Sequence, residues 1–157
     1  MKIIFLDLDG VLTTLSTKWQ TFHPDCVKAL KRVLDATGAN IVLSSCWRHG
    51  FIDWRTENNC LVHHTQALPV LKEMFIECGL PADTLISKTP DILNSNATRG
   101  EEISLWLKKH GEEFGVQQFI VLDDSSDVEP HFEHFVQTDG ELGMNEKDAD
   151  KAISLLT

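Results

Sequence analysis

Residues 2–12 read KIIFLDLDGVL, and residues 119–124 read FIVLDD. Each segment is an apolar run of the kind that forms a buried strand, followed at once by carboxylates. These carboxylates are Asp7 and Asp9 in the first segment, and Asp123, Asp124 and the nearby Asp127 in the second. The carboxyl ends of parallel strands form the ligand-binding edge of open α/β folds. If the two strands are neighbours, their carboxylates converge and repel one another, so a divalent cation is the natural partner.

Strand and helix patterns alternate along the rest of the chain. Apolar runs predict further strands at residues 40–43, 84–87 and 134–137. Apolar stripes bounded by helix start and stop residues predict helices at about residues 23–37, 66–78, 99–110 and 146–156. Residues 13–22 and 49–65 are polar and irregular. This alternation predicts one α/β domain over residues 1–157, a three-layer Rossmann-like fold with a mostly parallel central sheet.

The composition is that of a globular protein of one-domain size, with 157 residues of which 42% are hydrophobic and 24% charged. No apolar run approaches the roughly 20 residues that span a bilayer. The N-terminus lacks the pattern of a signal peptide, and the four cysteines include no CxxC pair, which favours free thiols. We therefore expect a cytoplasmic protein with no membrane partner; export without a classical signal peptide is the other option.

The charge balance restricts the partners. The formal net charge is −10 at pH 7, and no Lys/Arg-rich run is present. Proteins that track duplex nucleic acid usually neutralise phosphates with a basic surface. The sequence therefore argues against a duplex-binding surface. It remains compatible with a phosphorylated substrate such as a nucleotide, a nucleic-acid end or a phosphoprotein.

The Asp7-x-Asp9-Gly10 motif fits nucleophilic catalysis on phosphorus. Asp7 would attack the phosphorus atom and form an aspartyl phosphate. Asp9 would protonate the leaving oxygen and then activate the water that hydrolyses the acyl phosphate. Gly10 would let the backbone turn sharply behind the two carboxylates.

Three other uses of such carboxylates are excluded. An EF-hand loop beginning at Asp7 would have Val11 and Lys18 at its fifth and twelfth positions, where it needs oxygen ligands. A Walker B role for Asp123-Asp124 would need a GxxxxGK[ST] motif, which the chain lacks. A phosphorelay receiver domain has its acidic pair at the first strand and its lysine at the last, the reverse of the order here.

The ordered motifs resemble those of the haloacid dehalogenase-like (HAD) superfamily of phosphohydrolases. The matching segments are residues 5–12, the strand ending at Ser44, and residues 121–124 with Asp127. This resemblance implies that Asp7 is the nucleophile and Asp9 the acid and base. It also implies an Mg²⁺ cofactor. Its ligands would be Asp7, the Asp9 backbone carbonyl and Asp124 in preference to Asp123, with Asp127 in an outer position or bound through water.

The same resemblance implies phosphate-binding side chains. Ser44 would donate to a phosphoryl oxygen with help from the backbone that follows it at Ser45, and Arg48 is either a further phosphate ligand or part of a structural ion pair. The third HAD motif usually supplies a lysine; Arg99 matches that position best, and Lys88 is the rival. Either cation can neutralise the nucleophile and the transition state.

A narrower resemblance rests on residues 44–48 (SSCWR), 99–107 (RGEEISLWL) and 138–140 (TDG), which are similar to the HAD domains of Swiss Army Knife RNA repair proteins. The short intervals between motifs leave no room for the separate cap domain of many HAD proteins. We expect an open cleft, shaded by residues 49–65 through Phe51 and Trp54. The expected function is Mg²⁺-dependent phosphate monoester hydrolysis. The alternatives are a polynucleotide-end or nucleotide phosphatase, and a non-catalytic module that binds Mg²⁺ or a partner.

Overall fold

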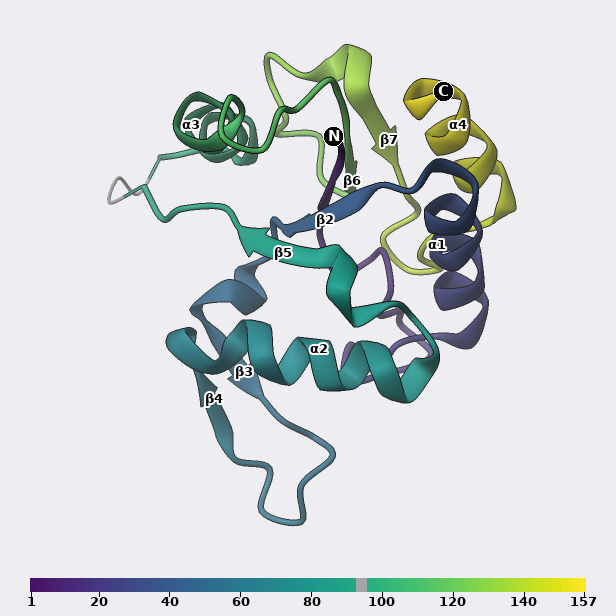
Figure 1. Ribbon diagram of the computed structural model, residues 1–157. Helices are drawn as coiled ribbons and strands as arrows, with labels where there is room; N and C mark the ends of the chain where they lie inside the picture. The colour runs from purple at the N-terminus through teal and green to yellow at the C-terminus, as the bar shows by residue number, and fades with distance from the viewer. Residues whose placement is uncertain (93–95) are drawn as a thin grey trace.

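A five-stranded parallel sheet organises the chain in the computed structural model, which describes residues 1–92 and 96–157 (Figure 1). The strand order is β5-β2-β1-β6-β7. The strands are β1 (Lys2–Leu6), β2 (Asn40–Leu43), β5 (Leu85–Lys88), β6 (Gln118–Asp123) and β7 (Phe135–Gln137). The predicted mostly parallel α/β sheet is confirmed, with the strands of the first, second and fourth motifs side by side at its centre.

In the described part of the chain, four α-helices cover the two faces of this sheet. They are α1 (Pro24–Thr37), α2 (Ala67–Cys78), α3 (Arg99–His110) and α4 (Glu146–Leu156). Side chains alternate along β1, so Ile4 and Leu6 pack in one core with residues of α1, α2 and α4. Ile3 and Phe5 pack in the other core with Trp106 of α3. The predicted three layers are therefore confirmed, with α3 on the opposite side of the sheet from α1 and α4 (Figure 1).

The segment predicted to be irregular between residues 49 and 65 contains a β-hairpin. After a short 3₁₀ helix, η1 (Cys46–His49), strands β3 (Gly50–Ile52) and β4 (Leu61–His63) pair in antiparallel fashion. The strands have three residues each, and Val62 is the one residue of β4 that is buried. Such short strands carry too little alternation for a sequence pattern to reveal them. Apart from this hairpin, no separate cap is evident in residues 1–92 and 96–157.

The register of the central strands places the acidic motifs together. Leu6 of β1 pairs with Leu122 of β6, and the Asp7 N–H donates to the Leu122 carbonyl over 2.9 Å. Asp7 therefore leaves the sheet beside Asp123. Within the described residues, no helix is long and apolar enough to cross a membrane.

Candidate active site

Three carboxylates meet at the carboxyl edge of β1 and β6. Asp7, Asp123 and Asp124 each offer an oxygen, and these oxygens all lie within 4.8 Å of one another. Carboxylate oxygens are the ligands that Mg²⁺ prefers in proteins, so the donor set fits this ion. Asp123 is the least available of the three, because its Oδ1 accepts from the Ser125 N–H at 2.9 Å and its Oδ2 from Arg99 Nε at 3.1 Å. Asp7 and Asp124 are therefore the more available metal ligands of the cluster.

Asp124 is held in a tight space between two glycines. A Cβ at Gly10 would lie 2.7 Å from the Asp124 Cγ, and one at Gly140 would lie 2.7 Å from its Oδ2. Thr138 Oγ1 donates to the Gly10 carbonyl and joins the two glycine-containing loops. This contact holds residues 138–140 against the site. Any larger residue at position 10 or 140 would displace the Asp124 carboxylate.

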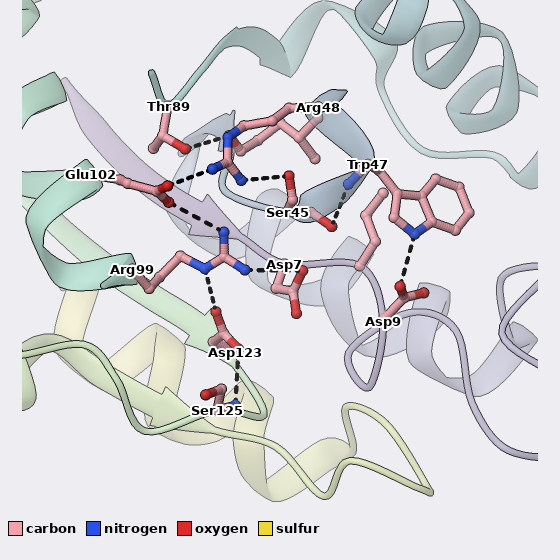
Figure 2. Close-up of polar contacts among 12 residues, drawn as sticks. Asp7, Asp9, Ser45, Trp47, Arg48, Thr89, Arg99, Glu102, Asp123 and Ser125 are labelled. Atoms are coloured by element: carbon pink, nitrogen blue, oxygen red, sulfur yellow. Dashed lines mark hydrogen bonds and ion pairs between the residues drawn. The ribbon is translucent and has the colours of Figure 1, made fainter. Parts of the chain in front are cut away.

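Arg99 is the cation of the cluster. It is the first residue of α3, and besides its bond to Asp123 its guanidinium lies 4.0 Å from Asp7 Oδ1 (Figure 2). Asp127 accepts the Arg99 backbone N–H at 3.1 Å and the Ser125 hydroxyl at 2.9 Å. The outer metal-ligand position predicted for Asp127 stays a prediction. In the structure its carboxylate fixes the start of α3, which sets the position of Arg99.

Burial changes the acidity of the central carboxyls. It raises the pKa of Asp7 to about 6, against the opposing effects of Arg99 and of a hydrogen bond from Ser45. Burial and the nearby Asp7 charge raise the pKa of Asp123 to about 7, although Arg99 again opposes the shift. Burial would lower the pKa of Arg99, but Asp123 and Asp7 outweigh it and raise the value. The cluster therefore has an excess of negative charge that one arginine does not neutralise. A bound divalent cation would neutralise it.

Asp9 lies beside this cluster with both carboxylate oxygens engaged. Thr13 Oγ1 donates to Oδ1 at 2.8 Å, and the Trp47 indole N–H donates to Oδ2 at 3.0 Å. The Trp47 ring stacks on Phe51 of β3 at 4.6 Å between ring centroids. Trp47 is buried in the core, and its contact with Asp9 was not predicted from the sequence. The sequence feature that could have indicated this contact is the position of Trp47 just after the second motif.

Ser45, rather than Ser44, faces the cleft. Ser44, the predicted phosphate ligand, is still paired with β1, because its N–H donates to the Leu6 carbonyl. Its Oγ is buried and has no hydrogen-bond partner within the described part of the chain. Ser45 lines the cleft, hydrogen-bonds Asp7 and caps η1 by accepting the Trp47 N–H. Both serines are buried and both follow β2, but the one that lines the cleft is Ser45, one position later than the predicted Ser44.

Arg48 forms the structural ion pair that the sequence left open. Its guanidinium is buried and donates to Glu102 Oε1 at 2.6 Å and to the Ser45 carbonyl at 2.8 Å. The other Glu102 oxygen lies 3.6 Å from Arg99 (Figure 2). Glu102 therefore connects the arginine that supports Ser45 to the arginine beside Asp7. No pattern in the sequence indicated this connection.

Lys88 lies elsewhere. Its ammonium group contacts the ring and the carbonyl of His64, and Lys88 is not among the described residues that line the cleft. Phe51 and Trp54 are also absent from that lining, because with Phe22 and Trp47 they line a separate cavity. The predicted shading of the cleft by Phe51 and Trp54 is therefore corrected.

The cleft itself has a volume of about 310 Å³ and is open to solvent. Its lining combines the acidic residues and Arg99 with one loop after β1 and one after β2. The lining residues are Asp7, Asp9, Gly10, Trp19, Ser45, Cys46, Arg99 and Asp124.

A parallel sheet with an Asp-x-Asp motif after its first strand, and acidic residues after the adjacent strand, defines the HAD class of domains. The model of one family of this class, described as the HAD domain in Swiss Army Knife RNA repair proteins, matches residues 3–149. The chain belongs to this family. No curated protein and no solved structure matches the chain.

Proposed function

We propose that this domain is a Mg²⁺-dependent phosphate monoester hydrolase that acts through an aspartyl phosphate on Asp7. One observation carries the proposal: Asp7 lies close to both Arg99 and Asp124, and two hydrogen-bond donors hold Asp9 in the same cleft. A structural ion cluster has no need of a second carboxylate aligned in this way. Membership of a HAD family supports the same chemistry.

In the first step, a carboxylate oxygen of Asp7 attacks phosphorus, and the bond from phosphorus to the leaving oxygen breaks. Asp9 gives its proton to that oxygen, so the product leaves as an alcohol. In the second step, Asp9 takes a proton from water while the water oxygen attacks phosphorus, which releases inorganic phosphate and restores Asp7. Arg99 and Ser45 stabilise the charge on the phosphoryl oxygens. Bound Mg²⁺ would supply further charge neutralisation and would be held by Asp7 and Asp124.

The substrate in this proposal extends beyond the cleft. A volume of about 310 Å³ is at the lower limit of pockets that enclose small molecules. Nucleotides, nucleic-acid ends and phosphoproteins all present a phosphate on a larger body. The family name supports phosphates of RNA ends as one candidate class, and the net charge of −10 argues against contact with a long duplex.

The test uses purified protein and p-nitrophenyl phosphate. We expect hydrolysis with Mg²⁺ and loss of hydrolysis with EDTA. Asp7→Asn should abolish turnover because it removes the nucleophile and keeps the volume of the side chain. Asp83→Asn, at an exposed aspartate far along the chain, is the matched control and should turn over normally. Full activity of Asp7→Asn would refute the mechanism, and no activity of the folded wild type on any phosphate ester would favour the non-catalytic module.

A further inference from the structure

Trp19 is a large aromatic residue at the mouth of the cleft. It lines the cleft together with Asp7, Asp9 and Arg99, and 38% of its surface is exposed. It belongs to the loop between β1 and α1, which sequence analysis treated as irregular. A tryptophan this exposed beside a catalytic cluster is available to contact a bound substrate.

The backbone holds Trp19 in an unusual conformation. Lys18 and Trp19 have φ angles of 53° and 59°, in the left-handed region that bulky residues rarely adopt. The Trp19 N–H donates to the Thr14 carbonyl at 3.1 Å, and just before it in the chain the hydroxyls of Thr14 and Thr17 each bond to the backbone of the other residue. Such conformations persist where the surroundings determine them, and they concentrate at functional sites. The hydrogen bonds of the loop therefore hold the backbone of Trp19 at the mouth of the cleft before any substrate arrives.

This inference rests on the proposed function. We infer that Trp19 determines specificity by stacking on the nucleobase of a nucleotide whose phosphate lies at Asp7. The cleft is small and open, so the body of the substrate extends towards its rim, where Trp19 stands. Stacking needs no positive charge, and it accepts every base because every base has a flat π face. It therefore suits a chain with a net charge of −10.

The loop favours a base over a peptide. A peptide usually gains affinity by pairing its backbone with an unpaired strand edge. In this loop the Trp19 N–H is bound to Thr14, and the Thr13 carbonyl accepts the Gly10 N–H. The rim beside Trp19 offers a flat ring and a backbone already engaged in its own hydrogen bonds. The rim is therefore better suited to stacking a base than to pairing with a peptide backbone.

The experiment compares two phosphate esters that differ in the base. Adenosine 5′-monophosphate carries one and ribose 5-phosphate does not, so the ratio of their kcat/KM values isolates the base. Trp19→Ala should lower kcat/KM for the nucleotide by roughly 5- to 100-fold, the range expected for losing one base–aromatic stack. It should leave ribose 5-phosphate within about twofold, and Trp19→Phe should recover most of the loss.

Trp54 provides the matched control, because it is 42% exposed and lies outside the described lining of the cleft. Trp54→Ala should leave the ratio unchanged. Equal losses of Trp19→Ala on both esters would overturn the inference, since they would indicate a general effect on the loop. A loss confined to a phosphotyrosine peptide would also overturn it. Calorimetry with adenosine monophosphate tests the stacking without turnover. Equal affinities of wild type and Trp19→Ala would refute stacking of the base on Trp19. If the protein does not hydrolyse the nucleotide but Trp19→Ala binds it more weakly than wild type, only the proposed function is refuted.

Discussion

Glu102→Gln is the most informative change for the network behind the cleft. The Glu102 carboxylate is buried and lies against two guanidinium groups, at 2.6 Å from Arg48 and 3.6 Å from Arg99. Glutamine keeps the volume and one acceptor oxygen but removes the negative charge. The positive charges of the Arg48 and Arg99 guanidinium groups then have one negative charge fewer to balance them. We expect a loss of stability and a lower kcat, because the Arg99 guanidinium would keep its bond to Asp123 but lose the second carboxylate that holds it beside Asp7.

The size of the stability loss follows from the contacts. Removing one partner of a buried ion pair costs about 3–5 kcal/mol. Two features reduce this figure: the amide oxygen of glutamine can still accept from Arg48, and burial already disfavours the charge, since it raises the pKa of Glu102 despite both arginines. We therefore expect a loss of about 2–3 kcal/mol in the free energy of unfolding. For a chain of this length, this lowers Tm by roughly 4–12 °C.

Thermal unfolding followed by circular dichroism measures this loss, and initial rates on p-nitrophenyl phosphate measure kcat. The matched control is Glu73→Gln, because Glu73 is exposed and pairs with Arg55 at 3.7 Å. Such a pair contributes about 0–1 kcal/mol, so its loss should shift Tm little. If Glu102→Gln unfolded at the wild-type temperature with unchanged kcat, the ionic connection between Arg48 and Arg99 would have no role in holding the site together.

Two further predictions address the cation and the carboxyls of the cluster. Arg99→Ala should lower kcat by roughly 10²–10³-fold, the loss expected when a group that stabilises transition-state charge is removed. Lys88→Ala should keep a kcat near that of wild type. The reverse order in steady-state kinetics would assign the third motif to Lys88. The raised pKa values of Asp7 (about 6) and Asp123 (about 7) mean that the folded state binds more protons than the unfolded state between about pH 4 and 7. Metal-free protein in EDTA should therefore lose stability as the pH rises through this window, and Mg²⁺ should raise Tm more at pH 7.5 than at pH 5; a Tm that rises with pH in EDTA would contradict the excess negative charge of the cluster.

The sequence determined the sheet and the place of the chemistry. Strand and helix patterns are local, so the spacing of apolar residues was enough to locate β1, β6 and α3 within a residue or two. The carboxylates after β1 and β6 follow these strands directly. Parallel strands end at the same edge, so their meeting point was already implied by the order of the motifs. The β3–β4 hairpin was not predicted from the sequence, because three-residue strands carry almost no periodic signal.

Only the tertiary structure decided which side chains complete the site. Arg99 and Lys88 are both cations near the right place in the chain, and the packing of α3 against the sheet brings Arg99 to Asp7. Whether Ser44 or Ser45 lines the cleft depends on how the backbone turns after β2, and no composition pattern records that turn. The contact between Trp47 and Asp9 joins residues 38 positions apart. Such contacts depend on three-dimensional packing between distant segments, and local sequence carries the residue types without the distances between them.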